Sequence, residues 1–123
     1  MREGEKNKQP EIDFKAILNV IDNLELTFDD YEAFEYMGTG FLIIPDDNPE
    51  SLRESGGAWY INSTAIDGFD IYLQESLSKE QRKRRLFHEV LEINLRDKQG
   101  FGQEDAHNIA QAKEQEVFGD YGK

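Results

Sequence analysis

Apolar and polar positions alternate along this chain with two different periods, which separate helical from extended segments. Apolar side chains recur every three or four positions in residues 14–24, the spacing of an amphipathic helix. The recurring positions are Phe14, Ile17, Leu18, Val20, Ile21 and Leu24. Asp13 stands directly before them, where its carboxylate can accept a hydrogen bond from the first turn. We therefore predict a helix that begins after Asp13.

Brief β-prone segments follow this helix. Four of them are predicted to form strands: residues 24–28, 41–44, 58–62 and 69–73. The connection 63–68 is short, so the last two strands are expected to pair antiparallel. The pattern in residues 31–37 is ambiguous between a strand and two helical turns. Residues 45–57 are rich in Pro, Asp, Asn, Ser and Gly, which predicts a loop.

The longest helical pattern runs from about residue 79 to residue 97. Ser78 precedes it as a good N-cap, and Gln81 stands three residues later, as in a capping box. Glycines at positions 100 and 102 then turn the chain, and a last helix is predicted from about residue 104 to residue 118. These elements predict an α+β fold, in which helices pack on one side of a small antiparallel sheet.

Composition and charge narrow the classes of protein. A chain of 123 residues fits one domain, and we expect a disordered N-terminal arm at residues 1–10 followed by a single domain at residues 11–123. The net charge of −12 argues against binding nucleic acid or an anionic membrane through a basic face. Neither a signal peptide nor an apolar segment of bilayer length is present, so a cytoplasmic location is expected. Because there is no cysteine, a metal site would need His, Asp and Glu.

The polar side of the predicted helix 79–97 holds candidate chemistry. His88 and Glu92 are four residues apart and therefore project to the same side, with Glu89 beside them. The second of the two histidines, His107, lies in the following helix, which is expected to fold back. A metal ion held by His88, Glu92 and His107 would keep one position open for water, as catalytic zinc sites do. Glu89 would then be the general base.

Other interpretations of these residues remain. In an ideal antiparallel helix pair Glu114 would face His88 more squarely than His107 does, although an imidazole is the commoner zinc ligand. His88 and Glu92 can also form a polar pair that needs no metal. The basic run of residues 82–85 is predicted to be a solvated stretch of helix.

Residues 69–118 resemble minimal zincin-like metallopeptidase domains, the ImmA/IrrE-type and related phage and bacterial proteins. That family places a strand before a helix that bears His-Glu-x-x-His, led in by a basic and apolar stretch. Here the strand is 69–73, the lead-in is 84–87 and the motif is HEVLE at residues 88–92, an HExxE motif. The resemblance implies a zincin-like fold, with His88 as the first ligand and Glu89 as the base. Glu92 stands where the family has its second histidine, and His107 would supply the second nitrogen.

The expected function is therefore that of a zinc-dependent, peptidase-like protein that hydrolyses peptide bonds through a metal-bound water. A peptide substrate could add as a strand to the edge offered by residues 69–73 or by residues 58–62. The alternative is a non-catalytic zincin-fold module for protein interaction or regulation, and a third is a purely structural acidic domain. Neither nucleic acid nor a membrane is an expected partner.

Overall fold

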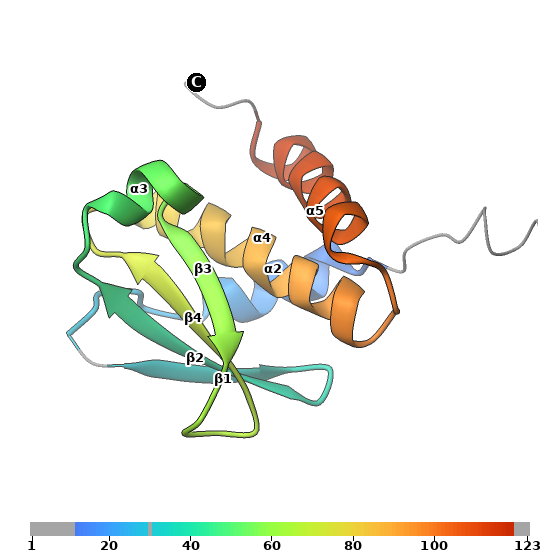
Figure 1. The fold of residues 1–123 in the computed structure, drawn as a ribbon, viewed down its shortest axis with the longest axis horizontal. Helices are drawn as coiled ribbons and strands as arrows, with labels where there is room; N and C mark the ends of the chain where they lie inside the picture. The colour runs from blue at the N-terminus through green and yellow to red at the C-terminus, as the bar shows by residue number, and fades with distance from the viewer. Residues whose placement is uncertain (1–11, 30, 120–123) are drawn as a thin grey trace, which may run out of the picture.

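A computed structural model describes residues 12–29 and 31–119 (Figure 1), so the predicted arm at residues 1–10 lies outside the described part. The elements are α2 (Phe14–Asp22), β1 (Glu32–Tyr36), β2 (Thr39–Asp46), α3 (Glu50–Ser55), β3 (Ala58–Asn62), β4 (Gly68–Gln74), α4 (Lys79–Asp97) and α5 (Gln103–Phe118). The strands form one sheet in the order β1-β2-β4-β3. The predicted α+β class is confirmed.

The sheet is mixed, so the predicted antiparallel sheet is wrong in one pairing. β3 and β4 pair antiparallel as predicted, and β1 and β2 also pair antiparallel. β2 and β4, however, run parallel, with Phe41 opposite Phe69 and Ile43 opposite Ile71. The chain passes from β2 through α3 to β3 at the sheet edge, and the short turn that follows sends β4 back between β2 and β3. β3 runs opposite to β2, and the short turn reverses the chain once more, so β4 shares the direction of β2.

In three other segments the pattern of apolar residues did not predict the observed structure. The predicted strand at residues 24–28 is absent, since Leu26 and Phe28 have φ values of 53° and 67°, outside the range of extended backbone. The ambiguous segment 31–37 contains strand β1. The predicted loop 45–57 contains the short helix α3, which ends where Gly56 adopts the left-handed conformation with φ 69°.

Helix α4 begins and ends as predicted. The Ser78 hydroxyl accepts a hydrogen bond from the Gln81 backbone N–H, and the Gln81 side chain accepts one from the Ser78 backbone N–H at 2.9 Å. This capping box fixes the rotational start of the helix, and therefore the direction in which each later side chain points. The last helix, α5, begins one residue earlier than predicted and lies antiparallel beside α4 (Figure 1).

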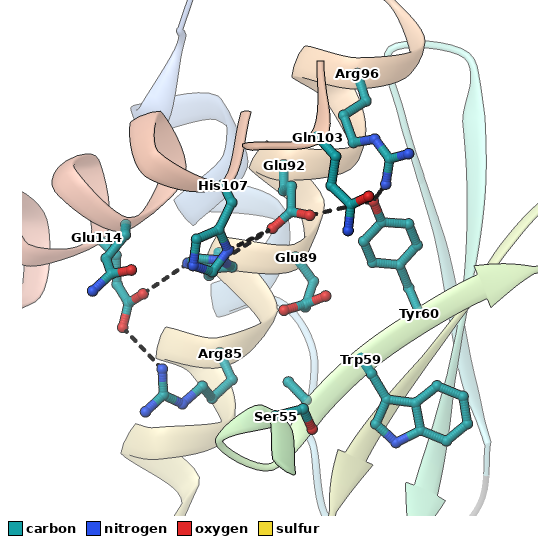
Figure 2. A pocket seen from close by; sticks show the side chains of 13 residues that line it. Ser55, Trp59, Tyr60, Arg85, Glu89, Glu92, Arg96, Gln103, His107 and Glu114 are labelled. Carbon is teal, nitrogen blue, oxygen red and sulfur yellow. Dashed lines mark hydrogen bonds and ion pairs between the residues drawn. The ribbon is translucent and has the colours of Figure 1, made fainter. Parts of the chain in front are cut away.

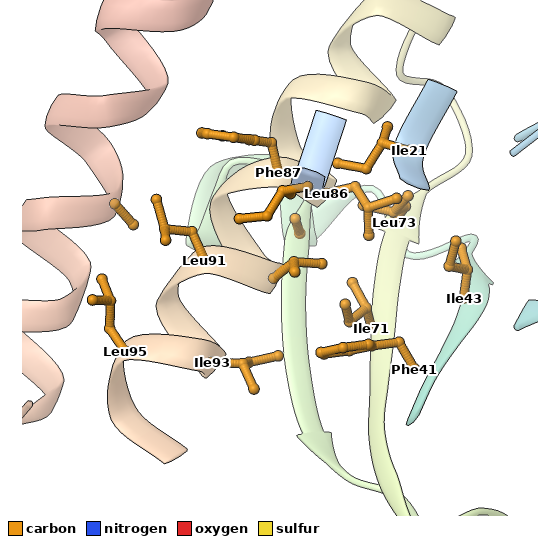
Figure 3. Packing of buried hydrophobic residues seen from close by; sticks show 14 of the residues in the cluster. Ile21, Phe41, Ile43, Ile71, Leu73, Leu86, Phe87, Leu91, Ile93 and Leu95 are labelled. Atoms are coloured by element: carbon orange, nitrogen blue, oxygen red, sulfur yellow. The ribbon is translucent and has the colours of Figure 1, made fainter. Parts of the chain in front are cut away.

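The core lies between α4 and the sheet. Ile71 and Leu73 of β4 are fully buried and point toward α4, where they meet Leu86 (Figure 3). On the neighbouring side of α4, Leu91 and Leu95 point toward α5 (Figure 3). The apolar residues that α5 packs against the core are Ala106 and Ala110, which are fully buried, and Ile109, Val117 and Phe118, which are partly buried. None of the helices in residues 12–29 and 31–119 combines the length and apolar character needed to cross a bilayer. Helix α4 is thus held on two sides by apolar contacts, and its remaining side carries the polar residues.

Candidate metal centre

Three of the predicted site residues converge between α4 and α5, and Figure 2 shows two of them, Glu92 and His107, pointing toward each other. His88 Nε2 lies 3.2 Å from Glu92 Oε1 on the same face of α4 and 3.3 Å from His107 Nδ1 on α5. The third side of the triangle, from His107 Nδ1 to Glu92 Oε1, is also 3.3 Å. His88 and Glu92 are buried, whereas about half of the His107 side chain is exposed, at 51%. The cluster is therefore enclosed on the α4 side and accessible to solvent on the α5 side.

These distances match the requirements of a tetrahedral zinc site. Zinc lies about 2.0–2.1 Å from nitrogen and oxygen ligands, so two ligand atoms of a regular tetrahedron are about 3.3–3.4 Å apart. The three donor atoms are separated by 3.2, 3.3 and 3.3 Å. Two nitrogens and one carboxylate oxygen also form a donor set that zinc accepts. The residues present therefore fit a zinc ion bound by three protein ligands, with the fourth position open.

Glu114 lies on the other side of His88. Its side chain is completely buried, and its Oε1 is 3.0 Å from His88 Nδ1. Its Oε2 accepts hydrogen bonds from Arg84 Nε and, at 3.5 Å, from Arg85 Nη1. A carboxylate held by two arginines acts as an acceptor, so His88 Nδ1 carries the hydrogen. In neutral His88 the lone pair is then on Nε2, the atom that faces Glu92 and His107.

The basic run that leads into the motif is not the solvated stretch that was predicted. Arg82 donates hydrogen bonds to the carbonyl oxygens of Leu26 and Glu75, and its guanidinium lies 3.9 Å from the ring centroid of Phe28. Arg84 and Arg85 turn toward Glu114. The prediction failed because it considered charge alone, whereas helical spacing places a buried acid of the next helix within reach of this run.

The hydrogen bonds of the cluster determine its protonation. Burial by itself would lower the pKa of His88, but the hydrogen bonds to Glu114 and Glu92 outweigh it and raise the pKa to about 9. Burial would raise the pKa of Glu92, yet hydrogen bonds and charges of His88 and His107 lower it overall. In the metal-free protein at neutral pH, His88 is therefore a cation between two carboxylates. A metal ion would bind there in exchange for a proton.

Glu89 lies in the same pocket as the cluster but does not belong to it (Figure 2). Only 8% of the residue is exposed. Burial raises the pKa of its carboxyl to about 7, opposed by the charge of His88. A carboxyl with this pKa exchanges a proton readily near neutral pH, which a general base or acid requires. The structure thus brings together the three expected ligands and places the expected base beside them.

The pocket has a volume of about 400 Å³ and is bounded by β3, α4 and α5. Of the two strands expected to offer an edge, only β3 does so, because β4 lies between β2 and β3. Tyr60 of β3 places its hydroxyl 3.4 Å from Glu92 Oε2, and Arg96 donates to that hydroxyl at 2.5 Å. Tyr60 is partly buried against the core and also lines the pocket, a position that the sequence analysis did not anticipate. The alternation along β3, which puts Tyr60 and Ala58 on the same side, was the signal that could have located it.

The comparisons with known proteins are negative. No model of a known protein family matches the chain, and neither the curated proteins nor the solved structures searched gave a significant match. The geometry of the cluster therefore carries the functional argument.

Proposed function

We propose that this protein is a zinc-dependent, peptidase-like hydrolase of the zincin type. In this proposal His88, Glu92 and His107 hold the metal and Glu89 is the general base. The observation that carries it is the triangle of donor atoms, whose three sides of 3.2–3.3 Å equal the edges of a zinc coordination tetrahedron.

The remaining side chains have complementary roles in this proposal. When bound, zinc would supply Lewis acidity and lower the pKa of a water molecule that it coordinates. The Glu89 carboxyl would accept a proton and return it to the leaving group, as its pKa of about 7 permits. Glu114 would keep the hydrogen of His88 on Nδ1, so that Nε2 stays available as a ligand atom.

The free edge of β3 suggests a peptide as the substrate. An edge strand offers backbone N–H and C=O groups that pair with an extended chain, independently of its side chains. Residues Ala58, Trp59 and Tyr60 of β3 line the pocket that also contains Glu89 and Glu92. A peptide added along β3 would therefore pass beside the cluster.

A non-catalytic interaction module is the second candidate, and one observation favours it. The polar groups of the cluster bond to one another: His88 to Glu92 and Glu114, and His107 to Glu92. A network satisfied in this way can serve as a structural element between two helices.

Elemental mass spectrometry on the untagged purified protein distinguishes the two candidates. The proposal expects close to one equivalent of zinc, lost in His88→Ala, with an exposed-residue substitution such as Asn108→Ala as the control. Absence of zinc, even after incubation with zinc salt, would favour the interaction module.

Activity is tested separately, in a peptide hydrolysis screen on zinc-loaded protein. Glu89→Gln should retain zinc and lose hydrolysis, because the amide cannot accept the proton. Full hydrolysis by that variant would show that Glu89 is not the base.

A further inference from the structure

The sheet has a second face, directed away from the helices. Along β4 the side chains of Ile71 and Leu73 point toward α4 (Figure 3), so the alternating residues Asp70 and Tyr72 point the other way. The strand residues that share this outer side with them include four apolar ones. These are Leu42 and Ile44 of β2 and Trp59 and Ile61 of β3. We call these six residues the outer face.

Part of the outer face is rigid as well as apolar. The rings of Trp59 and Tyr72, which are cross-strand partners, are stacked with centroids 4.0 Å apart and planes inclined by 4°. Trp59 Nε1 also donates a hydrogen bond to Asp46 Oδ2 at 2.9 Å. Even so, Trp59 and Ile61 remain 36% and 45% exposed. An apolar surface held in place in this way needs little ordering before it binds a partner.

Asp70 is the unusual member of the outer face. It is only 7% exposed, and its cross-strand neighbours are the apolar residues Leu42 and Ile61. Its Oδ1 has no hydrogen-bond partner among the residues that the structure describes. An unpaired polar atom in such surroundings lowers the stability of the folded state. The carboxylate therefore makes no evident contribution to the fold and is suited to receive a cation from outside.

We propose that the outer face docks a protein partner that presents a lysine or arginine within an apolar patch, with the cation placed against Asp70. Charge complementarity identifies this occupant. The charged side chains on the described strand residues of this side are all acidic, namely Glu35, Asp46 and Asp70. A second copy of the chain would oppose carboxylate to carboxylate and is disfavoured. This site lies on the opposite side of the sheet from the proposed zinc centre, although Trp59, at the edge strand β3, also lines the pocket of that centre.

The first test measures the melting temperature of the full chain. Asp70→Leu should raise it by several degrees, since the substitution removes an unsatisfied polar atom and adds apolar contact. The matched substitution Asp46→Leu should lower it, because the carboxylate of Asp46 accepts hydrogen bonds from Trp59 and from the Asn48 backbone. A lower melting temperature for Asp70→Leu would show a structural role for Asp70 and overturn the proposal.

The second test measures binding through fluorescence, because Trp59 is the only tryptophan in the chain. The probes are two amphipathic helical peptides without aromatic residues, identical except for a lysine or a norleucine in the centre of the apolar stripe. The lysine peptide should bind about tenfold more tightly, as expected for one charge-assisted contact. That advantage should vanish in Asp70→Asn and persist in Asp105→Asn, which removes the same charge from exposed Asp105 on α5.

Three further outcomes, from binding and sedimentation, would overturn the proposal. Equal affinity for the two peptides would show that the cation plays no part in binding. Absence of binding to either peptide would show that the outer face is not a docking surface. Sedimentation that shows a dimer of the wild type, dispersed by Ile61→Asp, would identify a second copy as the occupant.

Discussion

The two sides of α4 are buried by opposite means. Toward the sheet, Leu86 meets Ile71 and Leu73 in an apolar core in which each side chain is interchangeable with others of similar volume. On the side of α4 that faces the pocket, His88 and Glu92 are nearly as buried, at 6% and 7% exposure, but among charges. The core gains stability from the area it removes from water, whereas the polar cluster depends on directed contacts between particular atoms. The core therefore sets the fold, and the cluster sets what the fold can do.

The largest effect is expected in the core. Ile71→Ala should lower the free energy of unfolding by about 2–5 kcal/mol, because it leaves a cavity beneath α4. Ile61→Ala is the matched control on the neighbouring strand, where the side chain is 45% exposed, and should cost less than about 1 kcal/mol. Urea unfolding of both variants measures the difference. Equal losses would mean that the inner face of the sheet is not the main source of stability.

The cluster should respond to pH in a way that the core cannot. The pKa of His88 is raised from 6.5 to about 9 in the folded, metal-free protein. Its stabilising contribution is therefore fully present below pH 6.5 and is lost as the pH rises through 9. The raised pKa of Glu89, about 7, acts in the same direction between pH 4.5 and 7. Both groups make the metal-free protein less stable as the pH increases.

The measurement is urea unfolding of chelator-treated protein at several pH values. Between pH 6.5 and 9 the free energy of unfolding should fall by roughly 3 kcal/mol, since one pKa unit corresponds to about 1.4 kcal/mol. His88→Gln should remove most of that fall. A pH-independent stability in the wild type would contradict the hydrogen bonds assigned to His88.

The smallest of the three effects concerns zinc affinity. Glu114→Gln should weaken zinc binding about 10–100-fold, because the amide no longer holds the hydrogen of His88 on Nδ1 as strongly. Glu116→Gln, on the same helix but 67% exposed at the side chain, is the control and should leave the affinity unchanged. Competition with a chromogenic chelator gives both values. An unchanged zinc affinity in Glu114→Gln would mean that Glu114 only packs against His88 and does not orient it.

Much of the fold could be predicted because its signals are local. The capping box of Ser78 and Gln81 defines where α4 starts, and the composition of residues 58–62 defines β3. The strand direction in the centre of the sheet is not a local property, so the parallel pairing of β2 and β4 could not be inferred. The prediction of a strand at residues 24–28 failed for another reason, because the apolar side chains there pack against the core from an irregular backbone.

The site was predictable in its members but not in their roles. Spacing along α4 brought His88, Glu92 and Glu89 together, and the turn before α5 brought His107 near them. The sequence analysis treated His107 and Glu114 as alternative ligands facing His88. Both reach His88, at opposite nitrogens of the ring. Only the crossing of the two helices determines which nitrogen each one meets.

The way in which α5 packs on α4 has a further consequence. Ala106 and Ala110 are the only fully buried apolar residues of α5, and its larger apolar side chains, Ile109, Val117 and Phe118, are only partly buried, so the polar groups of the cluster add to its attachment. In the proposed site, zinc would cross-link residues 92 and 107 across the turn and oppose local unfolding of the C-terminal helix. At a free zinc concentration about one hundred times Kd, this linkage amounts to about 2.7 kcal/mol. The resistance of α5 to proteolysis would then follow the supply of free zinc.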